Sequence, residues 1–251
     1  MHNKTLIDYT LHLADNALII GHRNSEWCGH GPVLEQDIAI SNIALDLIGQ
    51  ARNFYQYAAT VSGNGATEDT LAYLRDAIDF KNILLVELPN GDWAQTILKQ
   101  FFFSTYQYFL YQQLQNSKDA QLAAIAEKAL KEVTYHVRWS SEWVIRLGDG
   151  TLESKNRMLR AIDEIWSYTG EMFLAASYEL QGIREEYAVD LSEIQKNWVQ
   201  KITSVCIEAT LPLPADTWMQ SGGKEGKHTE YLGFILADMQ FLQRAYPGAD
   251  W

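Results

Sequence analysis

Residues 40–58 have the sequence ISNIALDLIGQARNFYQYA, and this stretch decides the fold class. Apolar side chains return along it every three or four residues for five helical turns, which places them on one face of an α-helix. The members of this apolar stripe are Ile40, Ile43, Ala44, Leu47, Ile48, Ala51, Phe54, Tyr55 and Ala58. The pattern predicts a long helix from about residue 33 to residue 61, which ends at the Gly/Asn-rich turn 62–65.

The positions of proline extend this prediction to the rest of the chain. Proline is excluded from helix interiors, and the five prolines of the chain leave residues 33–88 and 90–211 without one. Further helices are predicted over residues 5–20, from Asp92 as N-cap onward, and over residues 119–147, 152–180, 191–209 and 229–246. No composition shift marks a domain boundary. We therefore expect one all-α domain over residues 1–251, a helical bundle with additional C-terminal helices.

The composition excludes several classes of function. The chain has 20 Lys and Arg against 32 Asp and Glu, and its net charge of −12 argues against nucleic acid or an anionic membrane as partner. Cys28 and Cys206 lie too far apart in sequence to form a CxxC metal or redox motif. The N-terminus lacks the apolar run of a signal peptide, and no stretch approaches a membrane span. We expect a cytoplasmic protein.

A helical bundle suggests one kind of chemistry, a dinuclear carboxylate centre. Such a centre takes a Glu from each of two helices and a Glu-x-x-His from each of two others. Iron or manganese bound in this way can activate oxygen at open coordination positions. At the corresponding positions the chain has Leu47 and Gln50 in the first long helix, and Val133 and His136 in the helix over residues 119–147. Of these four residues, His136 alone is a suitable ligand.

The helix that begins at Asp92 offers no carboxylate, because residues 93–118 contain neither Asp nor Glu. Asp46 and Glu132 precede the motif positions by one residue, but together with His136 they are too few to hold two metal ions. We therefore expect a degenerate, metal-free site, with His136 as a buried histidine bonded to Glu132. The alternative is an autonomous di-iron oxidase with shifted ligands at Asp46, Glu132 and His136.

Five stretches of the chain carry a family resemblance. They are EWCGH (26–30), NIALDLIGQARN (42–53), LLVELPNG (84–91), KEVTYH (131–136) and GGKEGKHTE (222–230). They closely resemble the C subunits of bacterial phenylacetyl-CoA epoxidase complexes, and the resemblance extends from end to end. It implies a ferritin-like fold and a metal-free structural subunit, whose catalytic A-subunit partner holds the di-iron centre. With a reductase subunit, such complexes convert phenylacetyl-CoA to its ring 1,2-epoxide, using O2 and electrons from NADPH.

The resemblance also points to a segment near residue 80 as a contact with the CoA end of the substrate. Its residues are Asp79, Phe80, Lys81 and Asn82. The acidic Asp79 counts against this interpretation, because its carboxylate would repel a phosphate. The alternative is a turn at the start of a helix, with Lys81 solvated.

The glycine-rich stretch 221–229 lacks the spacing of a nucleotide-binding P-loop. One interpretation is a flexible lead-in to a helix that Thr229 caps. The other is a loop that reaches the catalytic partner through Lys224, Lys227 and His228, where backbone amides could also meet a CoA phosphate. Both alternatives remain open at the level of sequence.

The resemblance, together with the missing ligands, implies a subunit that has no catalysis on its own and no cofactor in this chain. Its direct partner would be the catalytic A subunit, with the reductase and the other subunits as indirect partners and a possible contact with phenylacetyl-CoA. Besides the structural subunit and the autonomous di-iron oxidase, a third alternative is a stand-alone helical module that binds an acyl-CoA.

The aromatic stretch 101–111 would be covered either by the chain's own bundle or by a second chain.

Overall fold

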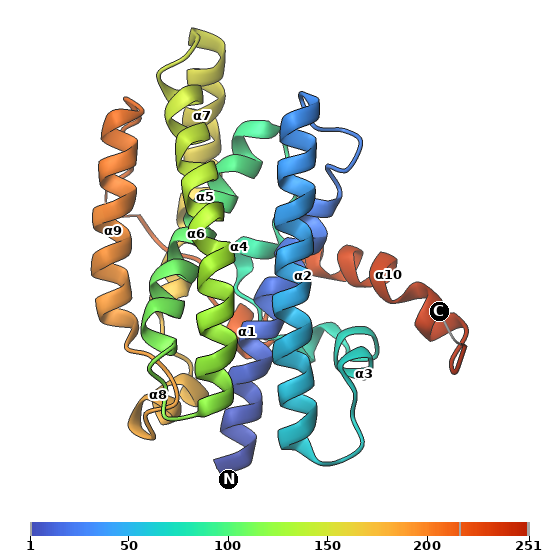
Figure 1. Cartoon of the computed structure of the whole chain (residues 1–251). Helices are drawn as coiled ribbons and strands as arrows, with labels where there is room; N and C mark the ends of the chain where they lie inside the picture. The colour runs from blue at the N-terminus through green and yellow to red at the C-terminus, as the bar shows by residue number, and fades with distance from the viewer. Residues whose placement is uncertain (1, 216, 250–251) are drawn as a thin grey trace. The chain divides into compact units, whose positions relative to one another are not determined.

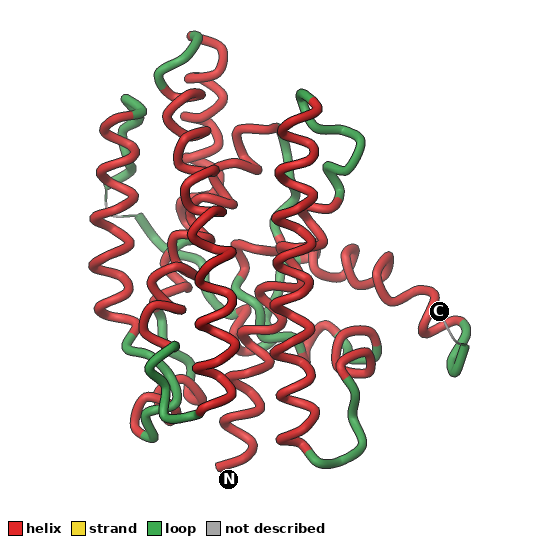
Figure 2. Tube along the Cα trace, in the orientation of Figure 1, coloured by secondary structure: helices red, strands yellow, loops and turns green. Residues whose placement is uncertain are grey.

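The computed structural model describes residues 2–215 and 217–249, and within these ranges every regular element is helical (Figures 1 and 2). The predicted all-α fold class, with further helices toward the C-terminus, is confirmed. The chain forms two compact units. Unit 1 comprises Met1–Pro89, Ala176–Gly182 and Gly222–Trp251, and unit 2 comprises Asn90–Ala175 and Ile183–Ser221. Both units are discontinuous in sequence, and the expectation of a single domain stays a prediction.

Unit 1 is built on two long helices that pack antiparallel to each other (Figure 1). Its elements are α1 (His2–Ser25), α2 (Leu34–Ser62), α3 (Glu68–Tyr73), η1 (Ala77–Asp79), α4 (Leu84–Glu87), most of α8 (Ser177–Arg184), η4 (Gly223–Glu225) and α10 (Glu230–Ala245). The predicted apolar stripe of α2 is buried except for Ile48, which is half-buried, and Ala39 and Gln50 are buried in addition. The helix ends at Gly63, whose φ of 61° lies in the left-handed region that glycine adopts without strain. The predicted end of this helix is confirmed.

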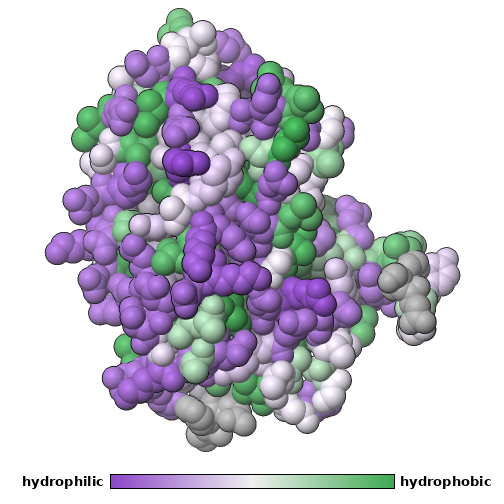
Figure 3. All heavy atoms as spheres, in the orientation of Figure 1, coloured by the Kyte–Doolittle hydropathy of each residue, from purple (hydrophilic) through white to green (hydrophobic). Residues whose placement is uncertain are grey.

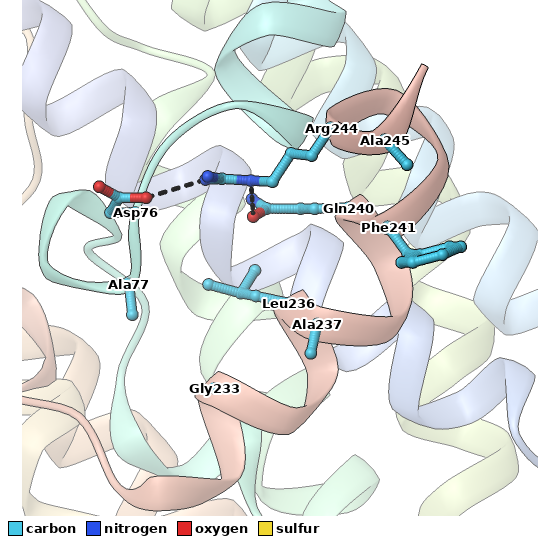
Figure 4. A pocket seen from close by; sticks show the side chains of 9 residues that line it. All are labelled: Asp76, Ala77, Gly233, Leu236, Ala237, Gln240, Phe241, Arg244 and Ala245. Atoms are coloured by element: carbon cyan, nitrogen blue, oxygen red, sulfur yellow. Dashed lines mark hydrogen bonds and ion pairs between the residues drawn. The ribbon is translucent and has the colours of Figure 1, made fainter. Parts of the chain in front are cut away.

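The C-terminal helix α10 is held to the segment after α3 by polar side chains (Figure 4). Gln240 Nε2 donates to the carbonyl oxygens of Ala72 and Arg75, at 3.2 and 3.0 Å. Arg244 pairs with Asp76 at 2.9 Å. A groove of about 560 Å³ lies between α10 and the residues around Asp76. From this attachment α10 leads away from α1 and α2 (Figure 1), so part of its surface stays uncovered within unit 1.

Unit 2 is organised around a helix that is buried on almost every side. Its elements are α5 (Trp93–Leu114), α6 (Ala120–Gly148), α7 (Leu152–Ile165), η2 (Trp166–Tyr168), η3 (Gly170–Phe173) and α9 (Leu191–Glu208). The predicted N-cap of α5 is confirmed, because the Asp92 side chain accepts hydrogen bonds from the backbone of Ala94 and Gln95. The aromatic rings of residues 101–103 are fully buried. The chain itself therefore covers them, which was one of the two alternatives.

One helix prediction is wrong. The helix expected over residues 152–180 stops at Ile165, and two short 3₁₀ turns follow it before α8 begins at Ser177. In these turns Gly170 lies against the side chain of Met219, where an added Cβ would come within 2.6 Å of Met219 Cγ. Trp166 packs against the rings of Phe102 and Trp198. Tertiary packing thus overrides the local helical pattern.

Candidate functional site

The two segments singled out in the sequence as candidates, 79–82 and 222–229, lie against each other in unit 1. His228 Nε2 is 3.0 Å from the carbonyl oxygen of Phe80. A Cβ added at Gly223 would lie 2.3 Å from the carbonyl oxygen of Asn82, and one at Gly226 would lie 2.3 Å from that of Ile78. The two backbones can approach this closely because glycine carries no side chain. Residues 222–229, which we call the C-terminal loop, are therefore packed against residues 78–82 within unit 1.

Side chains of α1 hold the backbone of residues 81–83. Asp15 accepts a hydrogen bond from the Lys81 backbone nitrogen at 2.8 Å, and His12 Nδ1 lies 2.7 Å from the Lys81 carbonyl oxygen. The Asn16 side-chain oxygen accepts from the backbone nitrogen of Ile83 at 2.8 Å. These three side chains share one face of α1, because residues three and four apart are neighbours on a helix. All three are buried, so the segment is fixed from within.

The Asp15 carboxylate is the centre of a buried ionic cluster. The hydroxyl of Tyr55 donates to it at 2.5 Å, and both terminal nitrogens of Arg75 bind it. Burial by itself lowers the pKa of Arg75, but Asp15 and Tyr55 outweigh this effect, so that the pKa rises and the guanidinium stays charged. The same guanidinium lies 4.2 Å from the centre of the Phe80 ring. Arg75 thus connects α1, α2 and residue 80.

A second cluster joins α4 to the C-terminal loop. The buried Glu87 carboxylate accepts hydrogen bonds from Asn82 Nδ2 at 2.9 Å, from His228 Nδ1 at 2.9 Å and from the Thr229 backbone nitrogen at 2.6 Å. Both ring nitrogens of His228 face acceptors, Glu87 and the Phe80 carbonyl, so the protonated imidazolium fits this place best. Burial lowers the pKa of His228. The hydrogen bond to Glu87 and the negative charge of Glu87 raise this pKa, and together they outweigh the effect of burial, so the net shift is upward.

A third cluster buries Lys224 of the C-terminal loop against Glu179 of α8. The Lys224 ammonium lies 2.9 and 3.1 Å from the two carboxylate oxygens, and Glu179 also accepts from the backbone nitrogen of Ala176. His12 Nε2 lies 3.7 Å from Glu179. Burial lowers the pKa of His12 to about 4, although the charge of Glu179 opposes the shift. His12 is therefore neutral at physiological pH and donates from Nδ1 to Lys81.

The candidate residues divide into an internal group and an exposed group. Phe80, Asn82 and Lys224 are buried, and their polar groups bind partners within unit 1. Asp79 and Lys227 are exposed. The partly exposed Lys81 ammonium lies 3.6 Å from Asp8 and 5.4 Å from the centre of the Tyr178 ring. A contact between this segment and a CoA ester stays a prediction, and so does a contact between the C-terminal loop and a partner.

Sequence reasoning missed most of these buried partners. They are His12, Asp15, Asn16, Tyr55, Glu87 and Glu179, together with the half-buried Arg75. One signal was present, because residues 11–20, LHLADNALII, place three polar residues inside an otherwise apolar helix. Buried polar side chains require partners, so this run could have indicated an internal network. The partners themselves are distant in sequence from these three residues. Tyr55 follows Asp15 by 40 residues, and the other partners lie still farther away.

The four positions that correspond to metal ligands lie on two helices, one in each unit. Leu47 and Gln50 belong to α2, and Val133 and His136 belong to α6; all four are buried, and the neighbouring Asp46 and Glu132 are half-buried. Leu47 and Val133 have no donor atom, so this set of side chains does not fit a di-iron centre. Within residues 2–215 and 217–249, no three His, Cys, Asp or Glu side chains are grouped as potential metal ligands. That the chain holds no metal stays a prediction.

Comparison with known proteins places the chain in a family. Residues 1–251 match the family model described as phenylacetic acid catabolic protein, and the chain belongs to this family. It is 48% identical over 246 residues to the C subunit of 1,2-phenylacetyl-CoA epoxidase from Escherichia coli (strain K12), a match that covers 98% of this chain and 99% of the relative. The resemblance inferred from the five stretches is confirmed. None of the described helices has the length and hydropathy of a membrane span.

Proposed function

We propose that this chain is the non-catalytic structural subunit of a phenylacetyl-CoA 1,2-epoxidase in aerobic phenylacetate catabolism, and that it binds and stabilises the di-iron catalytic subunit. The observation that carries this proposal is the 48% identity, over nearly the whole of both chains, to a protein named as the C subunit of that epoxidase. Since the match leaves no large region of either chain unpaired, the two proteins share their organisation from end to end. A shared role in a complex is the simplest consequence.

The chemistry of the side chains supports a role without catalysis. The oxygen-activating centre of such an epoxidase needs carboxylates and imidazoles from four helices. Here Leu47 and Val133 stand at two of the ligand positions, and α5 has no acidic residue between Trp93 and Leu114. What this chain contributes is therefore a rigid surface. A subunit that binds the folded form of its partner stabilises that form by mass action.

We further propose that residues 79–82 help to form the pocket for the CoA ester. Support comes from the way the segment is held, since Asp15, His12 and His228 bind its backbone and Glu87 binds the Asn82 side chain. The Lys81 ammonium stays partly exposed. A cation held in this way is suited to an anionic group of the ester. Asp8 lies 3.6 Å from this ammonium and tempers its charge, so the contact would be selective rather than strong.

The experiment that tests the proposal is reconstitution of epoxidation from separately purified subunits. The chain alone is expected to turn over no phenylacetyl-CoA, and the catalytic subunit alone is expected to be slow or unstable. Adding the chain should raise both turnover and the Tm of the catalytic subunit. Failure to bind the catalytic subunit would contradict the proposal, and so would turnover by the chain with the reductase alone.

A further inference from the structure

Helix α2 has a second apolar face, on the side away from its buried stripe. Leu34, Ile38 and Leu45 are exposed by 72, 52 and 67%, although each is a large hydrophobic side chain. Figure 3, drawn in the orientation of Figure 1, shows hydrophobic side chains at intervals over the first half of α2. Exposed apolar side chains that form a continuous line on one helix usually mark an interaction site.

The spacing of this second face indicates what kind of structure would cover it. The exposed apolar residues of the line are Leu34, Ile38 and Leu45, and with Ser41 and with Ile48, which borders the buried stripe, they follow steps of four, three, four and three residues. Alternating steps of this kind form the seam of a coiled coil, into which another helix inserts its side chains. Ser41 and Ile48 are half-buried, and the other three are exposed. At 1.5 Å per residue the seam is about 21 Å long, enough for four turns of a partner helix.

Gly49 gives an independent indication at the end of this seam. It lies in the middle of a 29-residue helix, is exposed, and would have no atom within 4 Å of an added Cβ. Glycine in a helix interior is unfavourable relative to alanine. Among residues 2–215 and 217–249, no atom within 4 Å uses the space that the missing side chain leaves. A second backbone that approaches α2 at this point would use it.

The charges beside the seam distinguish between two possible occupants. Glu35 and Asp46 lie on its polar edge, and Arg52, which follows Gly49 on the same face, already pairs with Glu68 at 3.4 Å. The edge is therefore acidic, in a chain whose net charge is −12. A second copy would bring the same acidic edge and the same net charge, which disfavours self-association. A helix with Lys or Arg beside its apolar residues is complementary.

We infer that the α2 seam, Leu34 to Gly49, is the docking site for an amphipathic helix of the di-iron catalytic subunit, with basic residues flanking its apolar line. This inference rests on the proposed function, which supplies the partner. It adds the surface and the recognition chemistry: knobs-into-holes packing along the seam, close backbone approach at Gly49, and charge complementarity at the acidic edge.

Two variants of α2, each with a matched control elsewhere, test this inference. Gly49→Leu should raise the Tm of the isolated chain, since leucine is a better helix former and the space is open, yet it should weaken binding of the catalytic subunit roughly tenfold or more by blocking approach. Gly233→Leu in α10 is its control, because Gly233 is also exposed with nothing within 4 Å of an added Cβ. Leu45→Glu should also weaken binding, and its control is Ile207→Glu in α9, which is 73% exposed.

Binding is measured by titration calorimetry with the purified catalytic subunit, and folding by circular dichroism. Loss of binding in both α2 variants but in neither control supports the inference. If the wild-type chain binds and both α2 variants bind equally well, the seam is not the docking site, while the proposed function stands. If the wild-type chain does not bind, the proposed function itself fails. A wild-type dimer in sedimentation equilibrium that Leu45→Glu dissociates would show a second copy as occupant and overturn the inference.

Discussion

Three buried carboxylates in unit 1 each combine a cation with a backbone N–H group. Asp15 binds the Arg75 guanidinium and the Lys81 backbone nitrogen. Glu87 binds the His228 ring and the Thr229 backbone nitrogen, and Glu179 binds the Lys224 ammonium and the Ala176 backbone nitrogen. A buried charge is unfavourable unless hydrogen bonds and an opposite charge replace its water. Each carboxylate therefore fixes an irregular segment to a helix. Helices α1, α4 and α8 supply the carboxylates, and the irregular segments supply the N–H groups.

Replacing Lys224 with methionine should be strongly destabilising. Lys224→Met leaves the buried Glu179 carboxylate without its cation, and breaking a buried pair on one side typically costs about 3 kcal/mol or more. The exposed Lys227→Met is the control and should change the free energy of unfolding by less than about 0.5 kcal/mol. Urea denaturation of both variants measures the difference. Equal stability of the two would contradict the view that this pair anchors the C-terminal loop.

His12 should make the protein less stable in mild acid. Its pKa is about 4 in the folded chain against an ordinary 6.5, so the unfolded chain takes up a proton first as the pH falls. The contribution of His12 is complete above pH 6.5 and is lost as the pH falls toward 4. Between about pH 7 and about pH 5, the free energy of unfolding should fall by about 2 kcal/mol because of His12. Urea titrations at both pH values should show a smaller loss in His12→Asn, and an unchanged loss would argue against a buried neutral histidine.

His228 should have the opposite effect. Its pKa is raised in the folded chain, so its contribution to stability is complete below pH 6.5 and is lost as the pH rises through the raised value. The expected result is that the wild-type chain loses stability from neutral to mildly alkaline pH, and that His228→Gln loses less over the same range. Denaturation midpoints across that range measure it. A steeper decline in the variant would contradict the imidazolium assigned here.

These ionic clusters could not be predicted from sequence, for a physical reason. Local pattern reports which face of a helix is apolar, but the partners of the buried residues of α1 come from residues 55, 75, 81 and 179. The sequence nevertheless singled out residues 79–82 and the C-terminal loop through family resemblance. It did not indicate that these two segments contact each other. That contact depends on Gly223 and Gly226, whose lack of side chains is informative once their neighbours are known.

Helix ends were more predictable than helix lengths. Asp92 and Thr229 act as the predicted N-caps, and Asp119 caps α6 where that helix was expected to begin, since a carboxylate or hydroxyl before an apolar periodic run satisfies free N–H groups. The helix expected over residues 152–180 failed because no proline or glycine-rich turn marks its end at Ile165. There the ring packing of Trp166 on Trp198 and the burial of Met172 in unit 2 redirect the chain, and this information is absent from the local pattern.

The cap of α5 offers a direct test at the level of the helix. Asp92→Ala removes the acceptor of the Ala94 and Gln95 backbone nitrogens and should lower the free energy of unfolding by about 1 kcal/mol. Asp92→Asn should retain most of the stability, because asparagine caps about equally well. Arg157 also contacts Asp92, at 3.3 Å, but this exposed pair adds little. Equal destabilisation by both variants would show that the charge, not the cap, matters.

Across the whole chain, the sequence predicted the class of fold from periodicity and the family from five short stretches. The long helices were predictable because 3.6-residue periodicity is a local signal that each buried stripe repeats many times. The division into two discontinuous units was not, because a chain that leaves a unit and returns to it shows no change in composition. The role proposed for the chain rests on two observations. Its helices lack a full set of di-iron ligands, and the chain is similar over nearly its full length to the C subunit of an epoxidase.

The iron content of the purified chain tests this account most directly. Elemental mass spectrometry would be applied to the chain expressed alone in iron-rich medium, and then to its complex with the catalytic subunit. The account predicts far less than one iron or manganese atom per chain alone, with iron in the complex attributable to the catalytic subunit. Close to two iron atoms per isolated chain, accompanied by oxygen consumption, would show that this chain is itself an oxygen-activating enzyme and would contradict the account.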